Sequence, residues 1–298
     1  MRHRVETDAE DDRLIMHEIP VTSRLHTPDE GPAVVHPTAV VEPGCQLGEG
    51  VRVGPYCHLS SEAVVGAGTV LANGVTLVGR VRLGQRNRLH TGCVIGGEPQ
   101  DISYRGTPTE VIIGDGNVIR EGVTINRGSE KEEGRTVLGN HNFLMAASHV
   151  AHDCEIADHV TIANGTLLGG HVRVDSHASL SGAVAVHHFV RIGAWAFVAG
   201  LSRVLQDIPP FMLAEGMPAR PRCANLVALR RGGFAPYEIK AIVEAHRLLY
   251  RAKAGLSATR EILETHQQLL PQVEELLSFI ATQQEGRHGR ALEKRRAA

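Results

Sequence analysis

Aliphatic side chains recur at every sixth position over most of the chain, with small or polar residues between them. The first run extends from Val35 to Ile95 without a miss, and the same spacing returns at 113–125 and at 138–204. A fixed short period is typical of a solenoid built from one repeated unit. A small or β-branched residue usually follows four positions later, and glycine often follows the aliphatic residue directly. Each hexad therefore predicts one short strand and a tight corner.

This pattern resembles the hexapeptide repeat of left-handed parallel β-helices, in which three hexads make one triangular coil. The handedness comes from the resemblance, since a period of six does not set it, and it departs from the usual right-handed rule for parallel crossovers. Stacked aliphatic side chains fill a narrow prism that has little room for aromatic rings. The composition agrees, because aromatic residues make up only 4% of the chain.

Two segments interrupt the period and are candidate functional loops. Within 95–113 the expected aliphatic positions hold Asp101 and Thr107, and the segment contains two prolines. The step from Ile125 to Leu138 is one position longer than two hexads and includes the charged run SEKEEGR. Loops that leave a rigid repeat scaffold often carry function.

The repeat stops at Pro209 and Pro210, and a helical pattern follows. Pro236 suits a first helical turn, and Ile239, Ile242 and Val243 sit at helical spacing after it. The predicted organisation is a polar extension over 1–32, a β-helix over 33–217, an α-helical C-terminal domain over 218–284 and a basic tail over 285–298.

Charge and hydropathy exclude several classes of function. The formal net charge of the 298 residues is only −2, which implies no strong attraction to nucleic acid. No apolar stretch is long enough to span a membrane, and the charged start at 1–12 does not resemble a signal peptide. Five cysteines, an odd number, favour reduced thiols. We therefore expect a cytoplasmic protein without membrane insertion.

The segment HVAHDC places ionisable groups in an otherwise apolar run. It contains His149, His152 and Asp153, and a neutral imidazole suits a general base that takes a proton from a hydroxyl. A coil of three hexads predicts that His152, Gly170 and His188 stack in one column. Asp153 and His171 should stack in the next column in the same way, with His187 on the same face. An exposed glycine N–H on this face could hold an oxyanion.

Accidental placement is the competing interpretation, because the chain has 17 histidines. His141, His159 and His177 are also separated by one coil each, and we interpret them as a solvated ladder without chemistry. The cluster around His152 differs from them because a carboxylate and a glycine accompany it.

Further motifs resemble the UDP-N-acetylglucosamine acyltransferase family over roughly residues 33–283. The chain is similar to that family in seven phrases: VHPTAVVEPG, PQDISYRGTPTEVIIGDGNVIREGVTINRG, AHDC, GGHV, AVHHF, QDIPPF and NLVALRRGGF. The resemblance implies transfer of a 3-hydroxyacyl group from acyl carrier protein to the 3-hydroxyl of UDP-N-acetylglucosamine, the first step of lipid A biosynthesis. It also implies a homotrimer and no cofactor or metal.

The resemblance assigns roles to individual residues. It implies His152 as general base, Asp153 as its orienting carboxylate and the Gly170 amide as oxyanion donor. The other residues that it places at substrate are His149, His171, His187, His188, Gln100, Asp101, Asn225 and Arg231. Asn225 and Arg231 would hold the UDP. Gly200 would end the acyl groove and, lacking a side chain, would admit a donor of about fourteen carbons.

Departures from the family pattern keep alternatives open. Ser103 stands where a lysine is usual, His188 where a glutamine is frequent, and Val227 and Gly232 replace an acid and a second arginine. A 3-amino analogue of the sugar is therefore an alternative acceptor. A related N-acyltransferase, an acetyl-CoA-dependent acetyltransferase, a zinc-binding protein of the γ-carbonic anhydrase type and a plain scaffold are the remaining alternatives.

Overall fold

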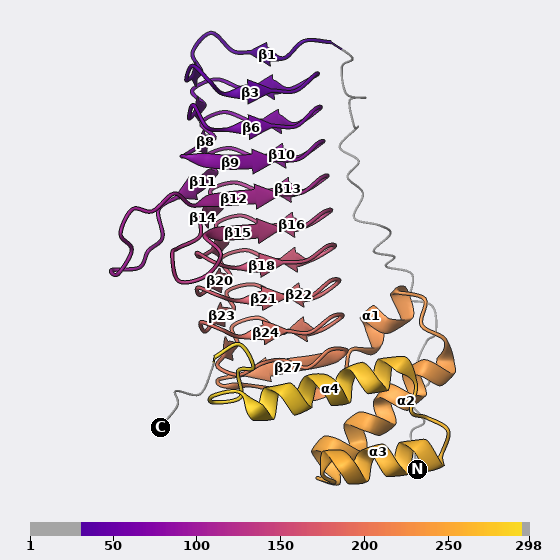
Figure 1. The fold of residues 1–298 in the computed structure, drawn as a ribbon. Coiled ribbons are helices and arrows are strands. Elements are labelled where there is room, and N and C mark those ends of the chain that lie inside the picture. The colour runs from indigo at the N-terminus through magenta and orange to yellow at the C-terminus, as the bar shows by residue number, and fades with distance from the viewer. Residues whose placement is uncertain (1–30, 294–298) are drawn as a thin grey trace, which may run out of the picture.

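The computed structural model describes residues 31–293, which form a left-handed parallel β-helix with helices across its C-terminal end (Figure 1). The fold predicted from the hexads is confirmed. The polar extension over 1–32, apart from its last two residues, and the last five residues of the basic tail lie outside the described residues.

Three sheets form the faces of the prism, and we name them A, B and C. Sheet A contains β1 (Val34–Val35), β4 (Arg52–Val53), β7 (Val70–Leu71), β10 (Arg88–Leu89), β13 (Val118–Ile119), β16 (Phe143–Leu144), β19 (Thr161–Ile162), β22 (Ser179–Leu180), β25 (Phe197–Val198), β27 (Met212–Gly216) and β28 (Ala219–Ala224). Sheet B contains β2 (Val40–Val41), β5 (His58–Leu59), β8 (Thr76–Leu77), β11 (Val94–Gly97), β14 (Thr124–Asn126), β17 (His149–Val150), β20 (Leu167–Leu168), β23 (Ala185–Val186) and β26 (Arg203–Val204). Sheet C contains β3 (Gln46–Leu47), β6 (Val64–Val65), β9 (Arg80–Leu83), β12 (Glu110–Ile113), β15 (Arg135–Leu138), β18 (Glu155–Ile156), β21 (Arg173–Val174) and β24 (Arg191–Ile192).

The parallel register measures the length of each coil. An ordinary coil of three hexads pairs Val53 of β4 with Leu71 of β7. The register instead pairs Ile95 of β11 with Ile125 of β14, and Ile125 with Val150 of β17, which are both longer steps. The first loop (98–109) and the second loop (127–134) account for the extra length, and both leave the prism on the same side (Figure 1).

Aliphatic side chains at the hexad positions fill the inside of the prism. From Val53 onward they are almost fully buried, whereas Val35 in the first coil is 39% exposed. The corners between sheets need a residue with left-handed backbone, and side chains other than glycine occupy many of them. Asp153 and His171 have φ near 60° at the corner between sheets B and C, and His159 has φ 58° at the corner between C and A.

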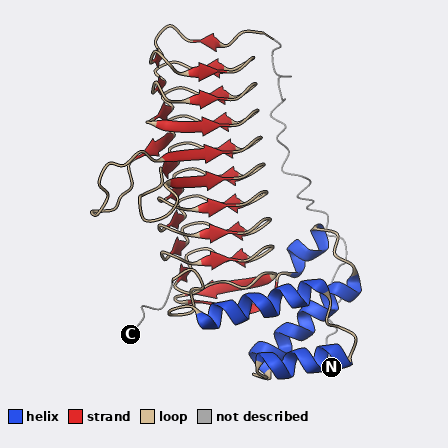
Figure 2. Cartoon of the chain, in the orientation of Figure 1, coloured by secondary structure: helices blue, strands red, loops and turns tan. Residues whose placement is uncertain are grey.

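The last strands and the helices close one end of the prism (Figure 2). Strand β28 pairs antiparallel with β27 and ends sheet A. After it come α1 (Leu226–Arg231), α2 (Pro236–His246), the π-helical turn η1 (Arg247–Arg251), α3 (Leu256–Thr265) and α4 (Pro271–Glu285). These helices bury a second apolar core that includes Leu229, Ile242 and Leu276. None of the helices in residues 31–293 has the length and apolar character of a membrane-spanning segment.

Candidate active site

The corner between sheets B and C, which we call the B/C corner, holds a histidine–aspartate pair. His152 and Asp153 form the turn after β17, and Nδ1 of His152 donates to Oδ2 of Asp153 at 2.7 Å. The Asp153 side chain is only 1% exposed. A carboxylate at Nδ1 fixes the proton on that nitrogen, so the lone pair of Nε2 is free to accept a proton.

The second loop holds the Asp153 carboxylate in place. The backbone N–H of Ser129 donates to Oδ1 at 2.8 Å, and its hydroxyl donates to Oδ2 at 2.6 Å. Burial alone would raise the pKa of Asp153, but the hydrogen bonds from His152 and Ser129 outweigh it and lower the pKa. The carboxylate is thus ionised and stationary beside the imidazole.

Gly170 lies one coil above His152 and leaves room for its ring. A Cβ at Gly170 would lie 2.7 Å from Nε2 of His152, which is closer than nonbonded atoms approach. A Cβ at this position would displace the imidazole, so glycine allows the ring to keep its place beside Asp153. The N–H of Gly170 donates to Nδ1 of His188 at 3.1 Å. The amide expected from the sequence to hold an oxyanion is thus occupied by a histidine ring.

His171 packs against the pair from the neighbouring column. Its ring stacks on Phe189 with centroids 4.3 Å apart and meets His152 edge-on at 5.1 Å. Its Nε2 lies 3.9 Å from Oδ2 of Asp153. Burial lowers the pKa of His171, which favours the neutral ring.

A cavity of about 320 Å³ opens beside His152 on the face of sheet B. Its wall consists of Gln100, His149, Ala151, His152, Leu167, Leu168, Gly169, Gly170, Ala185, Val186, His187, His188, Arg203 and Leu205. A hydrogen bond of 2.7 Å joins Nδ1 of His149 to Oγ1 of Thr124, and burial lowers the pKa of His149. Burial also lowers the pKa of His188. The cavity thus combines an apolar wall with two imidazoles, those of His149 and His188, whose neutral form is favoured by burial.

The two loops meet beside this cavity. Gln100 of the first loop reaches its wall, and Oδ2 of Asp101 accepts from Nζ of Lys131 in the second loop at 2.5 Å. The hydroxyl of Ser103 donates to the other oxygen of Asp101 at 2.8 Å. Ser103 stands where the family usually has a lysine, so this position lacks a positive charge. Lys131 supplies one from the other loop.

Three of the expected residues lie away from the cavity in a single chain. Asn225 caps α1, and its Nδ2 donates to the carbonyl of Trp195 at the corner between sheets C and A. Arg231 is exposed in the last turn of the same helix, and α1 lies on the side of the prism opposite the two loops (Figure 1). Gly200 is exposed at the corner between sheets A and B and does not line the cavity.

His152, Asp153 and His171 could also be considered as metal ligands, since their ligand atoms lie within 4.8 Å of one another. Both oxygens of Asp153, however, already accept hydrogen bonds from Ser129 and His152. This donor set matches a proton-transfer pair better than a zinc site, which needs free ligand lone pairs.

Comparison with known proteins agrees with the motifs. The family described as "Udp N-acetylglucosamine O-acyltransferase; Domain 2" matches residues 207–289, and the bacterial transferase hexapeptide family matches residues 135–170. The acyl-[acyl-carrier-protein]–UDP-N-acetylglucosamine O-acyltransferase of Gloeothece citriformis is 45% identical over 72% of this chain and 78% of its own length. That of Halorhodospira halophila is 40% identical over 85% of this chain and 98% of its own length. The chain belongs to this acyltransferase family.

Solved structures of the family have the same fold. The UDP-N-acetylglucosamine acyltransferase of Bacteroides fragilis superposes with a TM-score of 0.81 at 33% identity, covering 83% of this chain and 97% of that one. The enzyme of Francisella novicida gives a TM-score of 0.79 at 34% identity, covering 84% and 91%.

Sequence reasoning missed two residues that support the pair in this acyltransferase. Ser129 donates twice to Asp153, and Thr136 accepts from the N–H of Asp153 at 2.9 Å. Their only signal in the sequence is the position of Ser129 at the start of the charged second loop, where the frame shifts.

Proposed function

We propose that this acyltransferase moves a 3-hydroxyacyl group from acyl carrier protein to the 3-hydroxyl of UDP-N-acetylglucosamine, as the first step of lipid A biosynthesis. The observation that carries the proposal is the buried His152–Asp153 pair, whose histidine lines a cavity with an apolar wall. Membership of the family supports the donor and the acceptor.

His152 acts as the general base. Its Nε2 takes the proton of the sugar hydroxyl while the hydroxyl oxygen attacks the thioester carbonyl, and Asp153 stabilises the imidazolium that forms. When the tetrahedral intermediate collapses, the C–S bond breaks and the imidazolium returns its proton to the leaving thiolate. The products are the sugar ester and the free thiol of the carrier, so protons and atoms balance.

The Gly170 amide is the donor to the oxyanion, and it becomes available when the His188 ring moves away. The support is the 3.1 Å bond between the two, because an N–H that points at the cavity side chain can point at a substrate oxygen once that side chain leaves. His149, His171, His187, Gln100 and Asp101 surround the substrates.

The nucleotide is held by Asn225 and Arg231 of a neighbouring copy in a homotrimer. What supports this is the position of α1, which lies on the side of the prism opposite the two loops beside the cavity (Figure 1). One chain therefore cannot bring both α1 and its own cavity to one sugar nucleotide. Arg231 suits a diphosphate because its guanidinium donates in a fork.

The test is mass spectrometry of the product from UDP-N-acetylglucosamine and a panel of 3-hydroxyacyl carrier proteins, with His152→Ala as the matched inactive variant. We expect an O-acylated sugar nucleotide, and a loss of about 10²–10⁴-fold in turnover in the variant. The 3-amino sugar nucleotide is assayed in parallel. If it is acylated faster than UDP-N-acetylglucosamine, the 3-amino sugar is the acceptor. A variant that keeps about a third of wild-type activity would remove His152 from the role of base.

A further inference from the structure

The residues after α4 fold back onto the B/C corner, and we call residues 286–293 the C-terminal strap. Asp207 is the anchor of the strap and is 2% exposed. Its Oδ2 accepts from the N–H of Ala291 at 2.7 Å, and its own N–H donates to the carbonyl of Gly289 at 2.9 Å. Its other oxygen accepts from the N–H of Arg191 at 2.8 Å. One buried aspartate therefore joins the strap to sheet C.

Arg290 extends from the strap to the wall of the cavity. Its side chain is 8% exposed, and its Nη1 donates to the carbonyl of Leu205 at 2.8 Å, a contact between segments far apart in the sequence. The rest of its guanidinium pairs with Glu293, also in the strap. The side chain of Leu205 lines the cavity in front of His152. Arg290 thus holds the backbone of a residue that forms the cavity wall.

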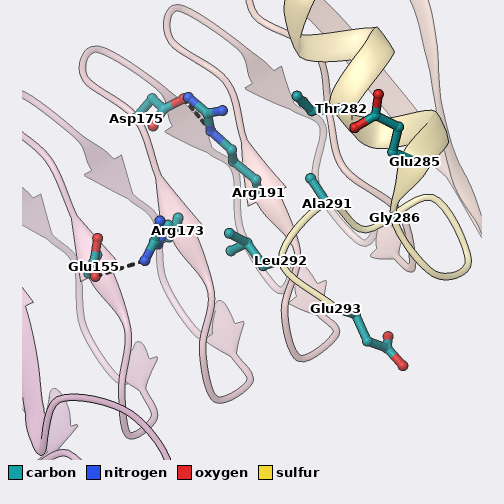
Figure 3. Close-up of a pocket in the computed structure, with 10 residues that line it drawn as sticks. All are labelled: Glu155, Arg173, Asp175, Arg191, Thr282, Glu285, Gly286, Ala291, Leu292 and Glu293. Carbon is teal, nitrogen blue, oxygen red and sulfur yellow. Dashed lines mark hydrogen bonds and ion pairs between the residues drawn. The ribbon is translucent and has the colours of Figure 1, made fainter. Parts of the chain in front are cut away.

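The strap touches a second, larger hollow on its other side. A cavity of about 660 Å³ lies between sheet C and the strap and is lined by charged residues, including Arg173, Asp175 and Glu293 (Figure 3). None of the described residues that line it is a histidine, and its ion pairs, such as Arg191 with Asp175, are internal. The hollow borders the strap itself, and the hydrogen bond from Arg290 is a contact by which the strap holds the backbone of Leu205.

We propose that Arg290 is a positioning residue for the acyl-donor cavity, and that it acts by fixing the Leu205 wall through the strap. This inference rests on the proposed function for the identity of the ligand. The matched family domain ends at residue 289, so Arg290 lies beyond the part of the chain that the family describes. Without the guanidinium, the Leu205 carbonyl loses a charge-assisted hydrogen bond in a half-buried setting.

The test measures the affinity for 3-hydroxyacyl carrier protein without acceptor, by calorimetry. We expect Arg290→Met to weaken the Kd of a long-chain donor about tenfold, the effect of losing one such hydrogen bond. The Kd of the carrier protein without an acyl group stays unchanged, because Leu205 faces the acyl cavity. Arg290→Lys recovers part of the loss, since an ammonium can reach the carbonyl and keep the charge.

A truncation after Glu293 is the matched control. It removes Lys294, Arg295 and Arg296 but leaves the strap, so donor affinity should equal that of the full chain. A folded Arg290→Met protein with wild-type donor affinity would overturn the inference, and so would a full effect from the truncation. Because the readout needs no turnover, a wild-type chain that binds donor but forms no product overturns the proposed function alone. A wild-type chain that binds no donor overturns both.

Discussion

Two corners of the prism carry histidines in the same backbone conformation, yet only one has the groups needed for proton transfer. At the corner between sheets C and A, the rings of His141, His159 and His177 stack with centroids about 5 Å apart, and Trp195 continues the stack. At the B/C corner, His171 stacks on Phe189 in the same way. Ring stacking at the spacing of one coil is therefore a property of the coil and does not by itself indicate a site.

The two corners differ in the groups that donate hydrogen bonds to the neighbouring carboxylate. The presence of a carboxylate does not distinguish the two corners, contrary to the sequence-based interpretation, because Asp158 directly precedes His159. The Oδ1 of Asp158, however, accepts from the backbone N–H and the side-chain amide of Asn140. Asp153 instead accepts from the imidazole of His152 and from Ser129 of the second loop. An inserted loop thus supplies the hydrogen bonds that leave one carboxylate oriented toward a histidine.

The largest expected effect separates the two aspartates. Asp153→Asn should lower kcat about 10²–10⁴-fold, because an NH2 group replaces one of the two carboxylate oxygens that accept from His152 and Ser129, and the amide favours the wrong imidazole tautomer. Asp158→Asn, the matched change at the other corner, should leave kcat within about twofold. Steady-state kinetics on both proteins, with circular dichroism to confirm folding, checks the pair. Equal losses would mean that Asp153 acts through stability alone.

A smaller effect is expected at the third corner, between sheets A and B. The positive φ there belongs to Leu201, at 59°, so Gly200 is not needed for the turn and a side chain can be added. Gly200 does not line the cavity of a single chain, so Gly200→Met tests whether the acyl groove continues from that cavity to this corner against a neighbouring copy. In that case the new side chain should fill the space of about four methylenes, disfavour a fourteen-carbon donor by about 3 kcal/mol and shift the preference toward about ten carbons. Competition between donors, read by mass spectrometry, gives the ranking.

Gly182→Met, one coil earlier in the same column, is the control for that ranking. An unchanged ranking in a folded Gly200→Met protein would place the end of the acyl groove elsewhere. A larger shift in Gly182→Met would move it by one coil.

The smallest effect is expected in the second loop, whose Ser129 donates to Asp153 at the B/C corner. Ser129→Ala should lower kcat/KM about tenfold and the free energy of unfolding at neutral pH by about 1–2 kcal/mol, because Asp153 loses one charge-assisted hydrogen bond. The pKa of Asp153 is lowered by folding, so its stabilising contribution is present above the unfolded pKa near 4 and is lost as pH falls through the lower folded value.

The loss in free energy of unfolding caused by Ser129→Ala should therefore become smaller below about pH 4. Urea unfolding at several pH values would measure it. Ser257→Ala removes an exposed hydroxyl of α3 and serves as the control, whose free energy of unfolding should change little at any of these pH values. A deficit that stays constant with pH would show that the Ser129 hydroxyl does not act on the Asp153 carboxyl.

The parts of the fold that repeat could be predicted from the sequence. The hexad period fixes the strands, the three-sided coil and the neighbours of Gly170, because each coil copies the one before it. The bond between Gly170 and His188 depends on a side-chain rotamer, which spacing does not reveal. The contacts of Ser129, Lys131 and Arg290 arise where the period fails, in two loops and a tail whose charges suggest solvent exposure.

One departure from the family pattern also has a structural reason that sequence could not give. A Cβ at Gly232 would lie 2.5 Å from the ring of Trp195, so the aromatic end of the histidine ladder occupies the place of a side chain on the helical region. The absence of a second arginine after Arg231 therefore follows from packing between the prism and α1.

The antiparallel strand β28 makes the two ends of the prism unequal. It caps sheet A and is followed by helices with a core of their own, whereas at the other end, within residues 31–293, β1, β2 and β3 each pair with a single strand of the next coil. In a stack where each coil contacts only its neighbours, thermal fraying begins where a coil has one neighbour. Local unfolding should therefore begin at the first coil and proceed toward the B/C corner that holds His152. The coils before β11 separate the open end of the prism from the active site, so several repeats can unfold before the site is affected.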